Sequence, residues 1–348
     1  MEKHAAYDLI QMQSVPLSGK ILMTQRRIRE WYEYYEGNVY VAVSGGKDSQ
    51  VLAHLVMQMY PDVPLVFSNT GLEYESVRKK GLELADTVLR PQKSFLQIIT
   101  EYGYPVVSKE VSQAIYECQR ARINGKKLPR YRMEKLLGQK LNKDGTKSAF
   151  NMERYYFLLD APFLISHLCC YYSKKLPSEN YEKETGRKPY LGTMAQESRL
   201  RRTKWTVNGC NAFELGRPTS QPLSFWTEQD ILHYIKLYGL EIASVYGDIV
   251  PKTRMQGQIT LYDMSGEYEG CELTTTGAKR TGCTYCLFGI AQDKDRLVRL
   301  KAIEPFTYDY VMRGGRFNKN GLWVPYNGLG YRYVVEWLNE YGNMGISI

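Results

Sequence analysis

The sequence predicts an α/β fold with a doubly wound, mostly parallel sheet, followed by a C-terminal subdomain that carries cysteines. Three observations support this prediction. Short apolar segments such as residues 39–43 are typical of strands buried on both faces of a parallel sheet. Segments with helical periodicity separate these strands, which is the pattern of βαβ units. The region after residue 241 lacks this alternation and is rich in glycine, tyrosine and cysteine.

The alternation is clearest near the N-terminus. Residues 17–35 have a helical pattern in which Ile21, Ile28 and Trp31 recur on one face. The expected elements then follow in the order strand 39–43, helix from 48, strand 64–68, helix 74–86, strand 87–89 and helix 95–102.

A basic insertion, residues 119–150, interrupts this order. Beyond it we expect a helix over 148–170, a strand over 189–193, and a helix that begins after the N-cap residue Thr227 and reaches Tyr238. The change in composition predicts two domains. Residues 1–245 form the α/β domain, and residues 246–348 form the C-terminal subdomain.

The first strand leads into a glycine-rich loop with the sequence Ser44-Gly45-Gly46-Lys47-Asp48-Ser49. Glycines let a backbone approach phosphate groups closely, and the N–H groups at the start of a helix face an anion. Ser44 and Ser49 add hydroxyl donors, and Lys47 adds a positive charge. We therefore expect the whole loop to bind a nucleotide, with Lys47 and Asp48 as the catalytic residues. The alternative is a glycine turn before an unrelated helix.

The loop is not a Walker loop, which needs Gly-x-x-x-x-Gly-Lys-Ser/Thr. It resembles the loop of the PP-loop ATP pyrophosphatase superfamily, which has an adenine nucleotide alpha-hydrolase-like fold and cleaves between the α- and β-phosphates. Further motifs are similar to those of the phosphoadenylylsulfate (PAPS) and adenylylsulfate (APS) reductases. The resemblance implies that seven more residues bind the nucleotide: Asn69, Thr70, Gly71, Gly192, Glu197, Ser198 and Arg201. Cys283 and Cys286 form a Cys-x-x-Cys motif, and the sequence around it is also similar to the ATP-hydrolysing component of DNA phosphorothioation systems.

Two departures from the reductases stand out. Met194 takes the place of an arginine of the family and is followed by Ala195, so a cationic site for a sulfonucleotide is weakened. The reductases also carry an attacking cysteine in a Glu-Cys-Gly-Leu-His motif near the C-terminus, whereas no cysteine follows Cys286 in this sequence. We expect the scaffold to be kept and the reaction to differ.

The cysteines include a vicinal pair, Cys169 and Cys170, and a Cys-x-x-Cys formed by Cys283 and Cys286. Four such thiolates can bind a [4Fe–4S] cluster or a tetrahedral zinc ion. Adjacent side chains diverge and rarely serve one ion, and in the resembled reductases the pair serves a cubane cluster. We therefore expect a [4Fe–4S] cluster, with zinc or free thiols packed in a core as the alternatives. Substitutes, if only one of the vicinal pair is a ligand, are Cys210 and Cys271.

The net charge of +9 is concentrated in one stretch. Residues 120–147 hold ten Lys or Arg residues against Glu134 and Asp144, and they include Tyr131. Such a segment can follow the phosphate backbone of DNA or tRNA. A solvated insertion without a partner explains the same charge.

No apolar segment approaches the roughly 20 residues that span a bilayer. The charged N-terminus is not followed by the apolar region of a secretion signal. The seven cysteines, an odd number, do not resemble a disulfide framework. We expect a soluble, cytoplasmic protein with no membrane partner.

Together these features predict a PAPS reductase-like ATP pyrophosphatase. It would bind ATP with Mg²⁺, cleave the α–β bond to adenylylate a substrate, and support sulfur transfer to nucleic acid with a sulfur donor protein as a candidate partner. Two other interpretations remain open. One is a sulfonucleotide reductase with a non-standard nucleophile. The other is a nucleotide-sensing, nucleic-acid-binding module with a structural metal site.

Overall fold

The computed structural model describes residues 4–252 and 271–348. The chain divides into two compact units, each considered by itself below. The sheet unit comprises Met1–Asn69, Glu73–Arg90 and Pro177–Thr281, and the cysteine unit comprises Thr70–Leu72, Pro91–Leu176 and Gly282–Ile348. The boundary expected after residue 245 therefore falls inside the last segment of the sheet unit. Part of the expected C-terminal subdomain, residues 253–270, lies outside the described residues.

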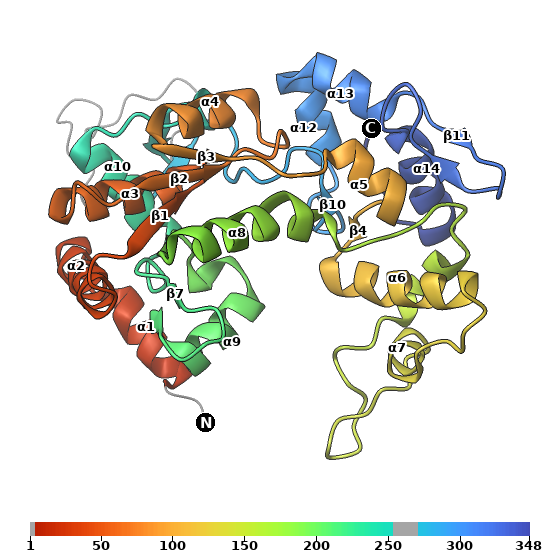
Figure 1. Cartoon of the computed structure of the whole chain (residues 1–348), viewed down its shortest axis with the longest axis horizontal. Helices are drawn as coiled ribbons and strands as arrows, with labels where there is room; N and C mark the ends of the chain where they lie inside the picture. Colours follow the sequence, from red (N-terminus) through yellow and green to blue (C-terminus); the bar gives the residue numbers. More distant parts are fainter. Residues whose placement is uncertain (1–3, 253–270) are drawn as a thin grey trace. The chain divides into compact units, whose positions relative to one another are not determined.

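The sheet unit is built on a six-stranded sheet with the order β3-β2-β1-β5-β7-β6 (Figure 1). Its strands are β1 (Val39–Val43), β2 (Leu65–Ser68), β3 (Thr87–Leu89), β5 (Lys188–Leu191), β6 (Asn211–Ala212) and β7 (Thr219–Ser220). All neighbours are parallel except β6 and β7. The chain moves from β1 outward through β2 and β3 and then returns to the other side of β1 with β5. This topology confirms the predicted doubly wound, mostly parallel sheet.

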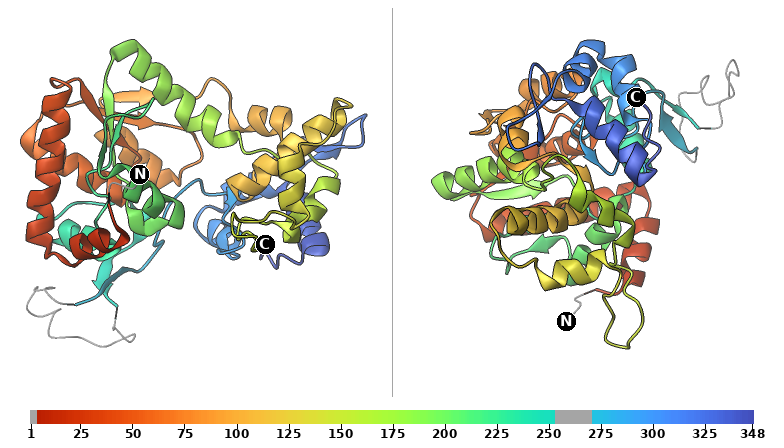
Figure 2. Two further views of the ribbon diagram at one scale, coloured as in Figure 1. Left: turned by 90° about the horizontal axis from the view of Figure 1, so that it is seen from below. Right: turned by 90° about the vertical axis from the view of Figure 1, so that its right-hand side faces the viewer.

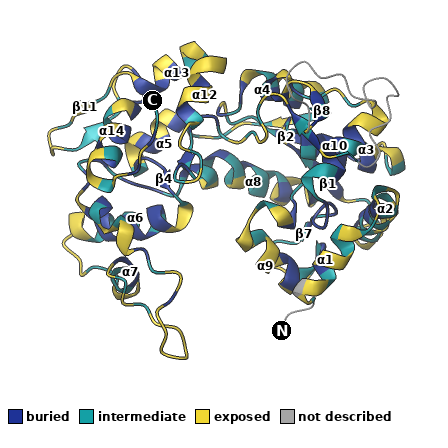
Figure 3. Ribbon diagram, turned by 180° about the vertical axis from the view of Figure 1, so that it is seen from behind, coloured by how far each residue is buried: buried dark blue, intermediate teal, exposed yellow. Residues whose placement is uncertain are grey.

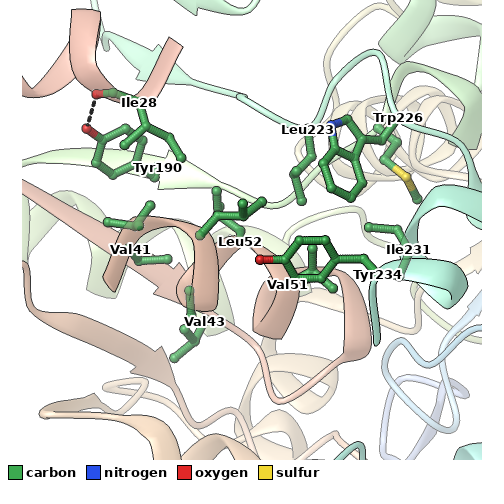
Figure 4. Packing of buried hydrophobic residues seen from close by; sticks show 14 of the residues in the cluster. Ile28, Val41, Val43, Val51, Leu52, Tyr190, Leu223, Trp226, Ile231 and Tyr234 are labelled. Atoms are coloured by element: carbon green, nitrogen blue, oxygen red, sulfur yellow. Dashed lines mark hydrogen bonds between the residues drawn. The ribbon is translucent and has the colours of Figure 1, made fainter. Parts of the chain in front are cut away.

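Strand β1 is buried on both faces, which explains its uninterrupted apolar sequence. Val41 and Val43 belong to the main hydrophobic cluster, together with Val51 and Leu52 of α3 (Lys47–Met59) (Figure 4). Side chains alternate across a strand, so Tyr40 lies on the opposite face. Its hydroxyl bonds the Glu182 carboxylate of α8 (Leu176–Thr185) at 2.7 Å.

The predicted helices and strands of this unit are present near their expected bounds. The helix expected at 17–35 is α2 (Leu17–Tyr34), the helix expected at 74–86 is α4 (Glu75–Leu84), and α10 (Glu228–Tyr238) is N-capped by Thr227. The remaining elements are α1 (Ala6–Ser14), α9 (Arg199–Asn208), short 3₁₀ turns at Ala195–Glu197 and Ser244–Tyr246, and the antiparallel pair β8 (Ile249–Pro251) and β9 (Leu273–Thr275).

The cysteine unit is mainly helical (Figures 1 and 2). Its helices are α5 (Phe95–Tyr102), α6 (Lys109–Ile123), α7 (Arg130–Leu136), α12 (Arg296–Ile303), α13 (Pro305–Met312) and α14 (Tyr331–Gly342). Two short pairs complete it: β4 (Val106–Val107) with β10 (Leu287–Phe288), which are parallel, and β11 (Arg316–Phe317) with β12 (Trp323–Val324), which are antiparallel. Among the described residues of the whole chain, no helix is long and apolar enough to cross a membrane.

The α-helix expected over residues 148–170 is wrong. A 3₁₀ helix, Glu153–Asp160, forms there, and a separate helical segment begins at Cys169 and continues through the π-helical turn Tyr171–Lys175 into α8. Proline at position 162 lacks an N–H group and disfavours helical geometry at the residue before it, Ala161. The next residues are extended, and Phe163 and Ile165 form bridges with Trp323 and Tyr104.

Candidate nucleotide site and thiol group

The phosphate loop leaves the carboxyl end of β1, and Gly192 follows the carboxyl end of the adjacent strand β5. The order of strands reverses between β1 and β5, and ligands of open α/β sheets bind at such a switch point. Gly45 has φ +72° and lies so close to α4 that a Cβ atom would collide with the Val77 carbonyl oxygen. A Cβ on Gly192 would lie 3.1 Å from the Ser49 Cα atom. Both glycines therefore permit close backbone contacts beside the loop.

Hydroxyl groups organise the loop from within. The Ser44 N–H donates to Ser49 Oγ at 3.0 Å, and the Gly46 N–H donates to Ser44 Oγ at 3.3 Å. Ser49 Oγ in turn donates to the Gly46 carbonyl oxygen at 2.8 Å. The helix α3 begins at Lys47 without a side-chain cap. Its first N–H groups and its dipole therefore suit an anion at this end.

Lys47 is the buried cation of this site, with its side chain 2% exposed. Its Nζ lies 3.3 Å from Asp48 Oδ1 and 3.0 Å from Glu228 Oε1. Burial by itself lowers the pKa of Lys47, but the two carboxylates outweigh this effect and the pKa is raised. Lys47 therefore stays charged and can stabilise a phosphate oxygen.

These groups line a pocket of about 190 Å³ in the sheet unit. Glu197 pairs with both Arg201 and Arg280 in it. Burial and the neighbouring Arg280 lower the pKa of Arg201. Such clustering of cations suits a multiply charged anion. The lining consists of Ser44, Gly46, Lys47, Asp48, Ser49, Gly192, Thr193, Glu197, Arg201, Tyr246, Arg280 and Thr281.

Several residues of this site were not expected from the sequence. The Tyr246 hydroxyl accepts a hydrogen bond from the Lys47 N–H at 3.3 Å and lies 2.6 Å from Thr281 Oγ1. Arg280, Thr281 and Glu228 also reach the loop from far along the chain. The basic pair Lys279-Arg280, which precedes the Cys-x-x-Cys in the sequence, is a signal from which Arg280 could have been proposed as an anion-binding residue.

Other predicted nucleotide-binding residues do not line this pocket. The Asn69 N–H donates to the Leu89 carbonyl oxygen at the end of β2, and Thr70 Oγ1 accepts from the Leu72 N–H. Thr70 and Gly71 group with the cysteine unit. Ser198 is the N-cap of α9, where its hydroxyl accepts from the Arg201 N–H. Their role in nucleotide binding stays a prediction.

Met194 occupies the position at which the resembled reductases carry an arginine. It is 3% exposed and belongs, with Ala195, to the hydrophobic cluster of the sheet unit. This position therefore contributes no cation to the pocket. Arg280 supplies one from a different part of the chain.

The predicted metal ligands all belong to the cysteine unit. The Sγ atoms of Cys169 and Cys170 are 3.9 Å apart, and the Cys286 N–H donates to the Cys283 carbonyl oxygen at 3.2 Å. The hydrogen bond with Cys170, burial, and the nearby Cys286 and Cys283 raise the pKa of Cys169, so the second pair lies close enough to act on the first. We call these four residues the thiol group.

The charges around the thiol group differ from one cysteine to the next. The pKa of Cys170 is lowered by Cys169 and, against the effect of burial, by Lys109 and Lys174. Burial and Cys283 raise the pKa of Cys286. The thiolate of this group is therefore favoured at Cys170, near two lysines.

Within residues 4–252 and 271–348, no three or more His, Cys, Asp or Glu side chains are arranged to hold a metal ion. The thiol group is nevertheless bordered by buried hydroxyls. In the part of the chain that the structure describes, Thr284 Oγ1 and the Tyr331 hydroxyl have no hydrogen-bond partner. Four thiols of one unit with buried donors beside them fit an iron–sulfur cluster in their chemistry.

The other cysteines lie elsewhere. Cys210 is buried in the hydrophobic cluster of the sheet unit, and Cys271 packs against that cluster. Cys118 is buried on α6 within the cysteine unit, 3.9 Å from the Met133 sulfur. Cys210 and Cys271 both belong to the sheet unit.

The basic segment 120–147 covers the end of α6, α7 and a loop that extends away from these helices (Figure 1). Figure 3 draws most of this loop as exposed, whereas most of α7 is intermediate or buried. Five of the ten cations in the basic segment form ion pairs with carboxylates: Arg122, Arg130, Arg132, Lys135 and Lys147. In the described part of the chain, no carboxylate pairs with Lys126, Lys127, Lys140 or Lys143.

Comparison with known proteins found similarities in sequence and in structure. A PAPS reductase from Candida auris, solved in a phosphate complex, shares 14% sequence identity, with 64% of this chain and 82% of that chain covered and a TM-score of 0.35. A search of curated proteins found no match. Residues 38–121, which include the phosphate loop, match the family model of the phosphoadenosine phosphosulfate reductase domain. Residues 38–121 of this chain therefore resemble that domain, as the sequence motifs predicted.

Proposed function

We propose that this protein binds ATP in the phosphate loop and cleaves its α–β bond to adenylylate a substrate. The observation that carries the proposal is the buried ammonium of Lys47 at the start of α3, in a pocket with Arg201 and Arg280. These groups suit the β- and γ-phosphates. Lys47, Arg201 and Arg280 each pair with a carboxylate of Asp48, Glu228 or Glu197, and phosphate oxygens at the N-terminus of α3 can take the place of these carboxylates.

In the proposed reaction, a nucleophilic atom of the substrate attacks the α-phosphorus. The bond from the α-phosphorus to the bridging oxygen breaks, and pyrophosphate leaves with the electron pair. Lys47 stabilises the negative charge that develops on the leaving group. Asp48, whose side chain is 26% exposed beside Lys47, would hold Mg²⁺ on the pyrophosphate oxygens, since Mg²⁺ is commonly bound by one or two carboxylates together with phosphates.

We further propose that the thiol group holds a [4Fe–4S] cluster rather than zinc. A zinc ion needs its ligands around one point at about 2.3 Å, and the described residues offer no such arrangement. The Sγ atoms of the vicinal pair are 3.9 Å apart. Adjacent cysteines nevertheless rarely serve one ion, and in a cubane cluster each thiolate binds a different iron. When bound, the cluster would supply a site that binds or polarises sulfur. The ammonium groups of Lys109 and Lys174 favour the thiolate form of Cys170 on the protein side.

The next step we propose is sulfur transfer to DNA or tRNA, with a sulfur donor protein as partner. Adenylylation turns a poor leaving oxygen into AMP, which a sulfur nucleophile can displace. The four lysines of the basic segment without a carboxylate partner among the described residues support a nucleic-acid substrate. The ion pairs of its other cations reduce the charge available for phosphates.

A second candidate is a sulfonucleotide reductase, and the family match over residues 38–121 favours it. Such an enzyme would need another cysteine in place of the family's nucleophile. The burial of Met194 in the hydrophobic cluster weakens this candidate, because the pocket lacks the cation that the family places there.

One experiment separates the candidates. Anaerobically purified protein is incubated with ATP, Mg²⁺ and candidate nucleic acids, and pyrophosphate is measured; in parallel, APS or PAPS is supplied with a thiol reductant, and sulfite is measured. Pyrophosphate without sulfite is the result we expect. Sulfite release would establish the reductase instead. Binding of ATP with neither product would indicate the nucleotide-sensing module.

A further inference from the structure

Two hydroxyl groups of the cysteine unit are buried and unsatisfied. Thr284 is 3% exposed and Tyr331 is fully buried. Neither Thr284 Oγ1 nor the Tyr331 hydroxyl has a hydrogen-bond partner among the described residues. Buried hydroxyls are nearly always paired, because an unpaired one costs free energy. These two hydroxyls therefore need hydrogen-bond acceptors that the described residues do not supply.

Both hydroxyls border the thiol group. Thr284 directly follows Cys283, and its N–H donates to the Leu72 carbonyl oxygen at 2.8 Å, which fixes its backbone. Tyr331 is the first residue of α14, and its ring lies 6.3 Å from that of Tyr285, inside the Cys-x-x-Cys turn. A tyrosine hydroxyl is ordinarily protonated at neutral pH, so the Tyr331 hydroxyl is available as a hydrogen-bond donor.

A neighbouring tyrosine provides a comparison within the same aromatic group. The Tyr104 ring lies 5.6 Å from that of Tyr331 and is buried to a similar degree. Its hydroxyl donates to the Leu329 carbonyl oxygen at 2.8 Å. The buried Tyr104 hydroxyl therefore has a backbone acceptor. The two hydroxyls that border the cysteines have no hydrogen-bond partner among the described residues.

We propose that the hydroxyls of Tyr331 and Thr284 donate hydrogen bonds to sulfur atoms of the cluster held by the thiol group and raise its reduction potential. This inference rests on the iron–sulfur cluster proposed above. Hydrogen bonds to the sulfurs stabilise the reduced form, which carries one more negative charge. Tyr331 and Thr284 are positioning residues in this role, since they bind no iron.

The test is a redox titration of anaerobically purified protein, followed by electron paramagnetic resonance. Tyr331→Phe and Thr284→Val each remove one donor. Each should lower the midpoint potential, so that the ratio of reduced to oxidised cluster at a fixed potential falls by up to about tenfold, which is 59 mV for a one-electron couple. Tyr104→Phe is the matched control and should leave the potential unchanged. Thr284→Ser keeps the hydroxyl and should retain the wild-type potential.

The failures are distinguishable. Wild-type iron content and an unchanged potential in both Tyr331→Phe and Thr284→Val would overturn this inference and leave the cluster proposal intact. Wild-type protein that holds zinc or no metal would overturn both. If Tyr331→Phe does not fold, the comparison of Thr284→Val with Thr284→Ser decides: a shift in the first alone supports the inference, and no difference overturns it.

Discussion

The nucleotide pocket of the sheet unit and the thiol group of the cysteine unit treat their buried polar groups in opposite ways. In the pocket, Lys47 pairs with Asp48 and Glu228, and the Tyr246 hydroxyl bonds both the Lys47 N–H and Thr281. Beside the thiol group, the hydroxyls of Thr284 and Tyr331 have no partner among the described residues.

The difference has a physical reason. A nucleotide comes and goes, so a pocket that binds it must keep its charges satisfied in both states, and carboxylates such as Glu228 can be exchanged for phosphates. A resident group is always bound, so the protein can leave donors that only this group satisfies. Under the two proposals above, the pocket is suited to turnover and the thiol group to permanent occupancy.

The largest expected effect tests whether the thiol group holds a resident cluster, which is one half of this comparison. Cys283→Ser should abolish the visible absorbance and the iron content of anaerobically purified protein, because one of four cluster ligands is lost. Cys271→Ser, in the sheet unit, is the control and should retain both. Metal analysis with absorption spectroscopy measures the outcome. Full iron in Cys283→Ser would show that this cysteine is not a ligand.

The next effect concerns the pocket. Lys47→Ala and Asp48→Ala should each lower the rate of pyrophosphate release from ATP by about 10²–10³, because a charged contact to the transition state is lost. Iron content should stay at the wild-type level, since these residues belong to the sheet unit. Lys80→Ala, which removes a lysine paired with Glu83 on α4, serves as control. Wild-type rates in both pocket variants would refute the assignment of the loop.

A smaller effect tests whether Arg280, which was not predicted from the sequence, contributes to ATP binding. Arg280→Ala should raise KM for ATP by about tenfold. A charge-assisted hydrogen bond is worth about 1.5–3 kcal/mol, and the 57% exposure of the Arg280 side chain reduces this value. The variant also leaves Glu197 with one cation fewer, which repels phosphate further. Arg202→Ala, exposed on α9, is the control and should keep the wild-type KM.

Local patterns predicted the strand–loop–helix arrangement around residues 44–49 well. The strand, the loop 44–49 and α3 are contiguous, so composition, glycine positions and helical periodicity all act over a short distance. Gly192 was predicted by resemblance, and the structure gives its physical reason, a close approach to Ser49. The doubly wound sheet was predictable for the same reason, because each strand and helix is encoded locally.

The parts that could not be predicted depend on contacts between distant residues. Tyr246 and Thr281 meet the loop only after the chain has folded back, and no periodic signal marks them. The helix expected over 148–170 does not form, because Pro162 interrupts it and the residues after it form bridges with Trp323 and Tyr104, which are distant in the sequence. The pairing of Arg132 with Glu117 on α6 also cannot be read from the basic segment alone.

The smallest expected effect leaves both sites intact and tests the substrate. Replacing Lys126, Lys127, Lys140 and Lys143 by glutamine should not change pyrophosphate release in the absence of nucleic acid. If these lysines contact phosphates of DNA or tRNA, each neutralised phosphate releases a counterion, so affinity depends steeply on salt. The variant should then flatten the slope of log affinity against log salt by up to about 3–4.

The lysines were chosen because the structure gives them no carboxylate partner among its described residues, unlike Arg130 and Arg132. A control with the same change in net charge replaces exposed lysines elsewhere, at Lys79, Lys183, Lys236 and Lys301. Binding of duplex DNA and tRNA is measured across a salt series for all three proteins. Equal slopes for the wild type and the segment variant, or an equal loss in the control, would remove the support for a nucleic-acid substrate and favour adenylylation of a small molecule.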